Sequence, residues 1–200
     1  MREVPAQITE RLSAAAELFA ERGLNDTKIE DVAAATGIAK ATLYYYFAGK
    51  EDILAFLLKD GLREVAEDVA AVVHTDGTGA ERLGGVISAQ LRVMAQRPMA
   101  QRPAVCRALI GELGRAARMP VIAEMISTAY LEPVEKLLIA GEADGSLVAQ
   151  NDPRSAATAL FGAVTTSALT YLITDDTLDE TLIAHTIQTL MFNGLRPRSP

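Results

Sequence analysis

Cysteine and tryptophan are the scarcest residues of the chain, which has a single cysteine, Cys106, and no tryptophan. One cysteine cannot form an internal disulfide. We interpret it as a small buried hydrophobic side chain, with a redox-sensing thiol as the alternative. Aromatic residues make up only 5% of the chain, although 50% of the residues are hydrophobic. The core must therefore consist mainly of aliphatic side chains and alanine, a composition that favours helices.

Several function classes lack the motifs that they require. No apolar run approaches the roughly 18 residues of a membrane span, and the N-terminus has no apolar signal-peptide core. The two histidines, His74 and His185, belong to no H-x-x-H, C-x-x-C or E-x-x-H pattern. We therefore expect a cytoplasmic protein that is not an enzyme, with no membrane partner, no metal site, no cofactor and no catalytic residue.

Positive charge is also in short supply, because the net charge of the chain is −7. This acidity argues against a protein that coats nucleic acid nonspecifically. The segment 38–50 is different, because it contains Lys40 and Lys50 and no acidic residue. A local basic spot on an acidic chain favours a small, directed contact with a polyanion.

No strand-like alternation of useful length is present, and helical periodicity accounts for most of the chain. Gly23 and Gly37 are expected to end helices, and Pro133 is expected to kink or split one. TKIE (27–30) and TLDE (177–180) match the capping-box pattern, and Asp152 followed by proline predicts a helix start. The predicted helices span 9–22, 27–36, 39–45, 50–73, 80–96, 104–118, 121–142, 153–174 and 178–193.

An aromatic cluster, LYYYF (43–47), lies in the third predicted helix. Leu43 and Phe47 are four residues apart and therefore share a face, which we expect to be buried. Tyr44 and Tyr45 must then point toward solvent or a ligand. A tyrosine ring packs on sugar and its hydroxyl donates to phosphate, so an exposed pair suits DNA.

The second and third predicted helices are joined by a tight turn at Gly37 and therefore form a helix-turn-helix. The second helix of such a unit lies in the major groove of DNA. The segment TKIEDVAAATGIAKATLYYYFAGKEDIL resembles the DNA-binding motif of TetR-family transcriptional repressors. The resemblance runs from about Ala15 to Leu58 and includes the capping threonine, the glycine turn, T-L-Y and K-E-D. Beyond Leu58 the chain matches the family only in its helical architecture and length.

The resemblance implies DNA contacts at the matching positions. Thr27 corresponds to a phosphate contact through its amide or hydroxyl, and the start of the recognition helix corresponds to contacts with base edges. Ala39 stands where relatives often have serine, which removes one helix cap. The implied DNA-binding residues are Thr27, Lys28, Lys40, Ala41, Thr42, Tyr44, Tyr45, Tyr46 and Lys50.

The last two predicted helices are candidates for a homodimer interface. One side of the helix 153–174 carries mainly small residues, which allow another helix to approach closely, and the helix 178–193 is strongly apolar. Two copies of this pair form a four-helix bundle across a twofold axis; the alternative is that both helices complete the core of a monomer. The candidate interface residues are Ala156, Ala159, Leu160, Ala163, Val164, Ser167, Tyr171, Leu182, Ile183, Ile187 and Leu190.

The middle helices are candidates for enclosing a small effector. Their inward positions are mostly apolar with a few polar groups, which suits a small hydrophobic molecule, although each residue is also compatible with an ordinary core. The candidate effector-binding residues are Leu91, Met94, Cys106, Ile110, Leu113, Met125, Tyr130, Phe161 and Thr165.

The sequence thus predicts an all-α protein with two domains. Residues 1–50 form a three-helix DNA-binding domain, and residues 51–200 form a six-helix domain for ligand binding and dimerisation. The predicted function is that of a TetR-type repressor that binds a palindromic DNA operator as a homodimer and is released by a small, unidentified effector. A helical protein-interaction scaffold and a cofactor-free helical enzyme remain as alternatives.

Overall fold

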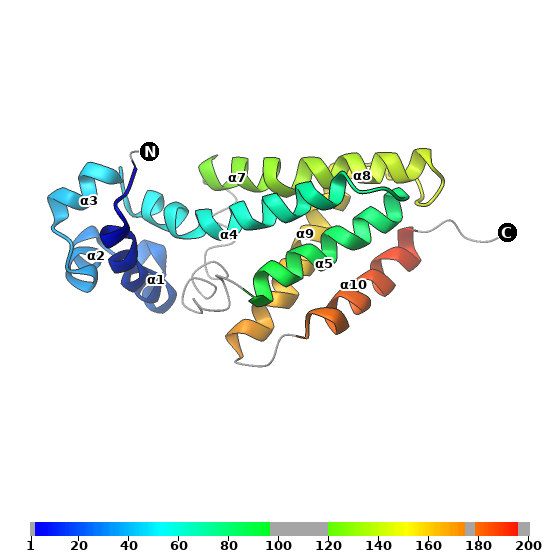
Figure 1. Cartoon of the computed structure of the whole chain (residues 1–200). Coiled ribbons are helices and arrows are strands. Elements are labelled where there is room, and N and C mark those ends of the chain that lie inside the picture. Colours follow the sequence, from blue (N-terminus) through cyan, green and yellow to red (C-terminus); the bar gives the residue numbers. More distant parts are fainter. Residues whose placement is uncertain (1–2, 97–119, 175–178, 196–200) are drawn as a thin grey trace. The chain divides into compact units, whose positions relative to one another are not determined.

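The computed structural model describes residues 3–96, 120–174 and 179–195, in which helices are joined by turns and no strand is present (Figure 1). The all-α prediction is therefore confirmed. None of the described helices is long and apolar enough to cross a membrane. The α-helices are α1 (Ala6–Asp26), α2 (Ile29–Thr36), α3 (Lys40–Tyr46), α4 (Lys50–Val73), α5 (Gly79–Gln96), α7 (Pro120–Ile126), α8 (Glu132–Ala143), α9 (Pro153–Ile173) and α10 (Glu180–Leu195).

The chain divides into two compact units, residues 1–60 with 102–123, and residues 61–101 with 124–200. The predicted helix 104–118 lies outside the described residues. In the first unit, α1 and the start of α4 supply buried side chains that enclose the inner faces of α2 and α3. Among the largest fully buried side chains of this unit are Leu12, Phe19, Leu24, Leu43, Phe47, Ile53 and Leu54.

Both predicted glycine breaks in the first unit are confirmed. Gly23 interrupts α1 with φ +76°, and Gly37 follows α2 with φ +63°, a left-handed conformation that glycine adopts without steric cost. The Arg11 side chain fixes the second turn, because its Nε donates to Thr36 O at 3.0 Å and its Nη2 donates to Gly37 O. Arg11 thereby caps the C-terminus of α2 from α1.

The predicted capping box at 27–30 is wrong by one residue. The Thr27 hydroxyl donates to Gly23 O at 2.7 Å, so Thr27 closes the interrupted end of α1. Lys28 is the N-cap of α2, and its backbone N–H donates to Asp31 Oδ2 at 2.9 Å. Glu30, which the TKIE pattern assigned to the cap, is exposed and bonds elsewhere.

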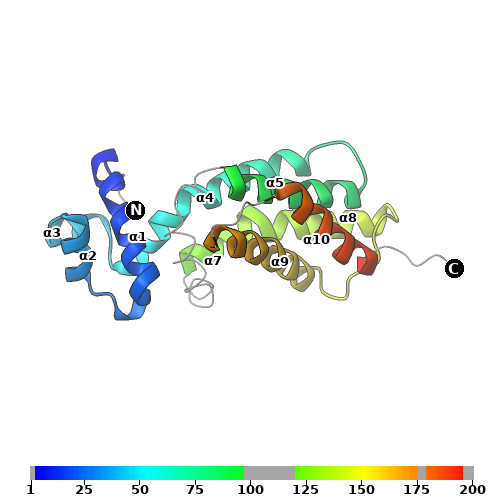
Figure 2. The same cartoon turned by 90° about the horizontal axis from the view of Figure 1, so that it is seen from below.

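The second unit packs α5 against α8, α9 and α10, as Figure 2 shows from below. The expected start of α9 is confirmed, because Asp152 Oδ1 accepts from Arg154 N at 3.1 Å and Pro153 is the first helical residue. At α10 the cap is Asp179, whose Oδ1 accepts from Leu182 N. Thr177 of the expected TLDE box lies outside the described residues.

Pro133 interrupts its helix as predicted, and the structure shows how. A π-helical segment, Ser127–Leu131, separates α7 from α8, and the N–H of Glu132 donates to Ser127 O. Proline has no N–H for the α-helical ladder, so the extra residue in this turn restores backbone pairing before α8 begins.

Gly79 and Gly141 make the closest backbone approach among the glycines of the second unit. A Cβ on Gly79 would lie 2.4 Å from Gly141 Cα. We expect Gly79→Ala to lower the free energy of unfolding by about 2–3 kcal/mol, because backbone atoms cannot move aside as a flexible side chain can. Urea denaturation at one fixed protein concentration measures this loss, and a change below about 0.5 kcal/mol would contradict the close approach.

Candidate nucleic-acid interface and effector region

The outer face of α3 carries the exposed aromatic residues that the sequence predicted. Tyr44 and Tyr45 are 52% and 59% exposed, whereas Leu43 and Phe47 are 1% and 2% exposed. Phe47 packs edge-on against Phe56 of α4, with ring centroids 5.5 Å apart, and this contact fixes the end of α3. Tyr46 is half-buried, with its ring edge-on to Tyr45 at 4.9 Å. The predicted division between inner and outer faces is therefore confirmed.

Lys40, the first residue of α3, has its ammonium group in an ion pair with the Glu30 carboxylate of α2. Both side chains are about half exposed, and Lys40 Nζ also lies 5.9 Å from the centre of the Tyr44 ring. The hydrogen bond from Lys40 lowers the pKa of Glu30, and the same bond raises the pKa of Lys40. The Lys40 ammonium, the only one in α3, is thus paired with the Glu30 carboxylate in the free protein.

Thr27 and Lys50 lie differently from what a phosphate contact requires. Thr27 is fully buried, and its hydroxyl is already bonded to Gly23 O. Lys50 Nζ donates to both Asn25 O and Thr27 O at 2.9 Å, so this ammonium ties the start of α4 to the end of α1. Lys28 and Ala41 are exposed, and Thr42 is half-buried.

The candidate effector residues fall into two groups. Cys106, Ile110 and Leu113 lie outside the described residues. The others belong to the second unit: Leu91, Met94, Tyr130 and Thr165 are buried, and Met125 and Phe161 are half-buried.

Two contacts involve these effector residues. The rings of Tyr130 and Phe161 meet edge-on at 5.1 Å. Thr165 Oγ1 accepts a 2.8 Å hydrogen bond from Gln90 Nε2 of α5. Sequence inspection missed Gln90, which is only 1% exposed. A glutamine between apolar residues of a helix is a weak signal that was available in the sequence.

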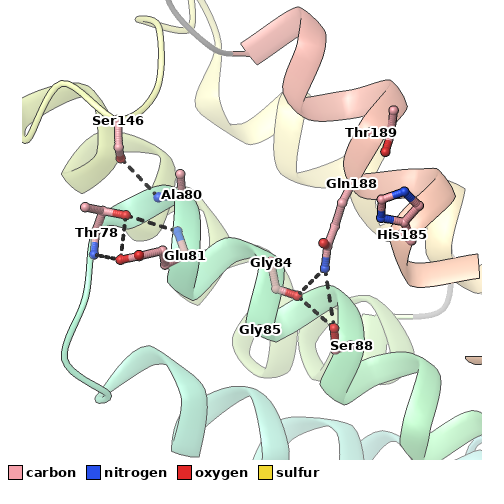
Figure 3. Close-up of a pocket in the computed structure, with 10 residues that line it drawn as sticks. All are labelled: Thr78, Ala80, Glu81, Gly84, Gly85, Ser88, Ser146, His185, Gln188 and Thr189. Atoms are coloured by element: carbon pink, nitrogen blue, oxygen red, sulfur yellow. Dashed lines mark hydrogen bonds between the residues drawn. The ribbon is translucent and has the colours of Figure 1, made fainter. Parts of the chain in front are cut away.

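A groove of about 780 Å³ lies elsewhere in the second unit, between α5, α10 and the turn after α8 (Figure 3). None of the candidate effector residues lines it, and most of its lining is polar. Gln188 Nε2 donates to Gly84 O at 3.0 Å, and Ala80 N donates to Ser146 Oγ at 3.1 Å. These groups join elements of the fold to one another, so we interpret the groove as structural.

Comparison with known proteins identifies the class of the chain. The family described as "Bacterial regulatory proteins, tetR family" matches residues 12–56, which contain α2, α3 and the parts of α1 and α4 that hold them. The fatty acid metabolism regulator protein of Bacillus subtilis (strain 168) is 25% identical over 193 residues, or 92% of this chain and 93% of that protein. The chain is a transcriptional regulator of the TetR family. Its type is that of a DNA-binding repressor rather than an enzyme.

Two further comparisons show how much of this TetR-family chain resembles known regulators. The HTH-type transcriptional repressor KstR2 of Mycobacterium tuberculosis (strain CDC 1551 / Oshkosh) is 34% identical over 92 residues, which is 46% of each chain. The crystal structure of FadR from Bacillus subtilis in complex with stearoyl-CoA has a TM-score of 0.69, 24% identity and coverage of 93% of this chain and 98% of that one. The fold therefore extends over nearly the whole chain.

The candidate interface residues of this TetR-family chain separate into buried and accessible groups. Leu160, Val164, Ile183 and Ile187 are buried within the protomer, so their side chains belong to its own core. That these four side chains face a partner protomer stays a prediction, and their burial leaves little of their surface accessible to one. Ala159, Tyr171, Leu182 and Leu190 are exposed, and Ala156, Ala163 and Ser167 are half-buried.

Metal binding finds no support in the described part of this regulator. No group of three or more histidine, cysteine, aspartate or glutamate side chains gathers there in a way that would hold an ion. His185 lies on the exposed side of α10, in the lining of the groove of Figure 3.

Proposed function

We propose that the protein binds a palindromic operator as a homodimer, inserts α3 of each protomer into the major groove, and is released by a small apolar effector. The observation that carries the DNA-binding part is the outer face of α3, where Lys40, Tyr44 and Tyr45 are exposed beside a buried inner face. One helix of this length reads few bases. Two copies about 34 Å apart read both halves of a palindrome.

Individual roles follow from the accessibility of each side chain. Lys40, Ala41 and Thr42 lie at the start of α3 and meet base edges, while Tyr44 and Tyr45 contact phosphate or thymine methyl groups. Lys28 adds a phosphate contact from the first turn of α2. We assign Thr27 and Lys50 mainly to holding α1, α2 and α4 together, because their side-chain donors are already used within the unit.

Glu30 opposes DNA binding in this proposal, because it pairs with Lys40 in the free protein. We expect Glu30→Gln to strengthen binding to DNA of any sequence severalfold, since the variant removes a negative charge near phosphate and releases Lys40. Fluorescence anisotropy with operator DNA and with unrelated DNA measures the two affinities. Unchanged or weaker binding to both DNAs would contradict this role.

The homodimer is assigned to the outward faces of α9 and α10. Leu182 and Leu190 are 58% and 71% exposed and lie two turns apart on α10, and Tyr171 of α9 is 38% exposed. Large apolar side chains exposed in a row mark an interaction surface. On α9 the exposed Ala159 and the neighbouring Gly162, whose missing Cβ would meet nothing within 4 Å, allow close approach of a second copy.

The effector is proposed to be a fatty acyl thioester of coenzyme A. Two findings support this class: the long match to a fatty acid metabolism regulator, and the similarity to a structure of FadR with stearoyl-CoA. Residues 51–200 hold the effector and the dimer interface, and residues 1–50 hold the DNA. The effector shifts the protein from its DNA-binding conformation to a second conformation only to the extent that it binds the second conformation more tightly. Such a repressor acts in the cytoplasm, where its operator is accessible.

Release from DNA tests the effector class. With labelled operator DNA and fixed salt, hexadecanoyl-CoA is expected to lower the DNA affinity at least about tenfold, which corresponds to about 1.4 kcal/mol of coupling. Free coenzyme A serves as the control and is expected to have no effect. Equal DNA affinity with and without acyl-CoA, over a range of acyl chain lengths, would eliminate this effector class.

A further inference from the structure

Among the buried polar atoms of the second unit that have no hydrogen-bond partner in the described residues, two belong to almost fully buried residues. They are the Tyr130 hydroxyl and Gln90 Oε1, and each side chain belongs to a residue that is only 1% exposed. Burying a polar group without a partner costs stability, and such groups in folded proteins usually have a function. Arg82 Nε is also unpaired, but its side chain is only partly buried and its Nη1 donates to Val73 O.

Both groups contact the same face of α9. The Tyr130 ring meets Phe161 at 5.1 Å, and Gln90 Nε2 donates to Thr165 Oγ1 at 2.8 Å. Phe161 and Thr165 are four residues apart, about one helical turn or 6 Å along the helix axis. The Tyr130 ring and the Gln90 side-chain amide thus contact α9 at neighbouring turns.

The backbone around Tyr130 is unusual as well. Tyr130 lies within the π-helical segment Ser127–Leu131. Single π-helical turns are rare and occur frequently at functional sites, because the extra residue redirects one side chain. Here the redirected side chain is an aromatic ring with a hydroxyl that ends in the core.

The neighbouring residues on these faces are uncharged. On α5 and α9 the buried positions one and two turns away are apolar, and they carry no ionisable side chain. A carboxylate or phosphate would therefore find no cation among these described positions of α5 and α9, whereas a neutral carbonyl or amide is matched. Burial raises the pKa of Tyr130, so its hydroxyl stays protonated and able to donate. The apolar residues are Val86, Ile87, Leu91, Met94, Leu160, Val164 and Ala168.

We propose that Tyr130 and Gln90 recognise the thioester head of the effector: the Tyr130 hydroxyl donates to the thioester carbonyl, and Gln90 Oε1 accepts from the first amide N–H of the pantetheine arm. This assignment rests on the acyl thioester proposed above. In such a molecule the carbonyl and that N–H are separated by a sulfur and two methylenes, a spacing comparable to one helical turn. The acyl chain then lies among the apolar residues of α5 and α9.

The test compares two probes that differ only at the carbonyl: hexadecanoyl-CoA, and S-hexadecyl-CoA, a thioether in which a methylene replaces the carbonyl. Isothermal titration calorimetry measures the affinity of the wild type and of Tyr130→Phe for each. We expect Tyr130→Phe to lose about tenfold in affinity for the thioester and nothing for the thioether. A variant that merely loosens the site would weaken both probes equally, and that result would overturn the proposal.

The thermal stability of the ligand-free Tyr130→Phe variant supplies a second test, because the substitution is expected to weaken ligand binding without lowering stability. Without ligand, Tyr130→Phe removes an unsatisfied buried hydroxyl, so its thermal midpoint is expected to equal or exceed that of the wild type. A lower midpoint would show that the hydroxyl is already used within the fold, and would overturn the proposal.

The double variant Gln90→Leu, Thr165→Val extends the test to the other group. It replaces both partners of one hydrogen bond with apolar side chains of similar size, which costs little stability. We expect it to keep the wild-type thermal midpoint and to bind hexadecanoyl-CoA about tenfold more weakly. Wild-type affinity in this variant would overturn the role of Gln90.

These outcomes are distinguishable from failure of the proposed function. If hexadecanoyl-CoA binds the wild type and releases it from DNA but the variants bind equally well, only the residue assignment is wrong. If acyl-CoA thioesters of several chain lengths do not bind the wild type, the effector class and this assignment are both wrong.

Discussion

Replacing Leu182 and Leu190 by aspartate is expected to convert the protein into a folded monomer that no longer binds its operator tightly. Both side chains are largely exposed in the protomer, so the substitutions leave its core intact. Buried in a dimer interface, however, four carboxylates would face one another without partners. Sedimentation velocity is expected to show half the wild-type mass.

The loss of the dimer is also expected to weaken operator binding, because a dimer links the two DNA-binding units that contact the two half-sites. The second protomer of a dimer binds at high effective concentration once the first is in place, so the monomer is expected to lose about 100-fold or more in operator affinity. The matched control is Ile139→Asp on α8, another exposed apolar residue, 51% accessible, which lies outside the proposed interface. A dimeric Leu182→Asp, Leu190→Asp protein would show that α10 does not form the interface.

Removing the Lys40 ammonium is expected to have the second large effect. In a dimer, Lys40→Ala deletes two contacts, one in each half-site, and about tenfold in affinity for each gives about 100-fold in total. If the contacts are to phosphate, the slope of log affinity against log salt becomes shallower by about 2. If they are to bases, the loss is largest on the operator and small on unrelated DNA.

Two control variants separate the loss of the Lys40 contact from the general loss of a positive charge and from the unpaired charge of Glu30. Lys59→Ala removes an exposed lysine of α4 and is expected to leave operator affinity within about twofold. Lys40→Ala also leaves Glu30 without its partner, so the double variant Lys40→Ala, Glu30→Gln measures the loss of the ammonium without the added negative charge. Wild-type affinity in that double variant would remove Lys40 from the contact surface.

The sequence predicted the first unit well because its signals are local. Gly37 needs a left-handed conformation, and Leu43 and Phe47 are spaced for one face; both features depend on residues close together in the chain. The TKIE capping box was predicted wrongly because another local hydrogen bond uses the Thr27 hydroxyl. Gly23 breaks α1, and the carbonyl thereby exposed accepts from Thr27, so α2 begins with Lys28 instead.

Features that depend on distant residues were not predictable in the same way. Lys50 appears free in the sequence, but carbonyl groups of Asn25 and Thr27 accept from it across more than twenty residues. Gln90 finds Thr165 across 75 residues. On α9 and α10 the apolar pattern predicted an interface. Each helix carries apolar residues both on its buried side and on its exposed side. Helical periodicity alone therefore could not identify the side that packs against the rest of the protomer.

Selection of binding sites from random double-stranded DNA tests the central claim most directly. The proposed function predicts that the wild-type protein enriches an inverted repeat whose half-site centres are about 34 Å apart, or one helical turn of DNA. It also predicts that the Leu182→Asp, Leu190→Asp variant does not enrich the repeat. Recovery of no preferred sequence, or of a single half-site bound equally well by both proteins, would contradict it.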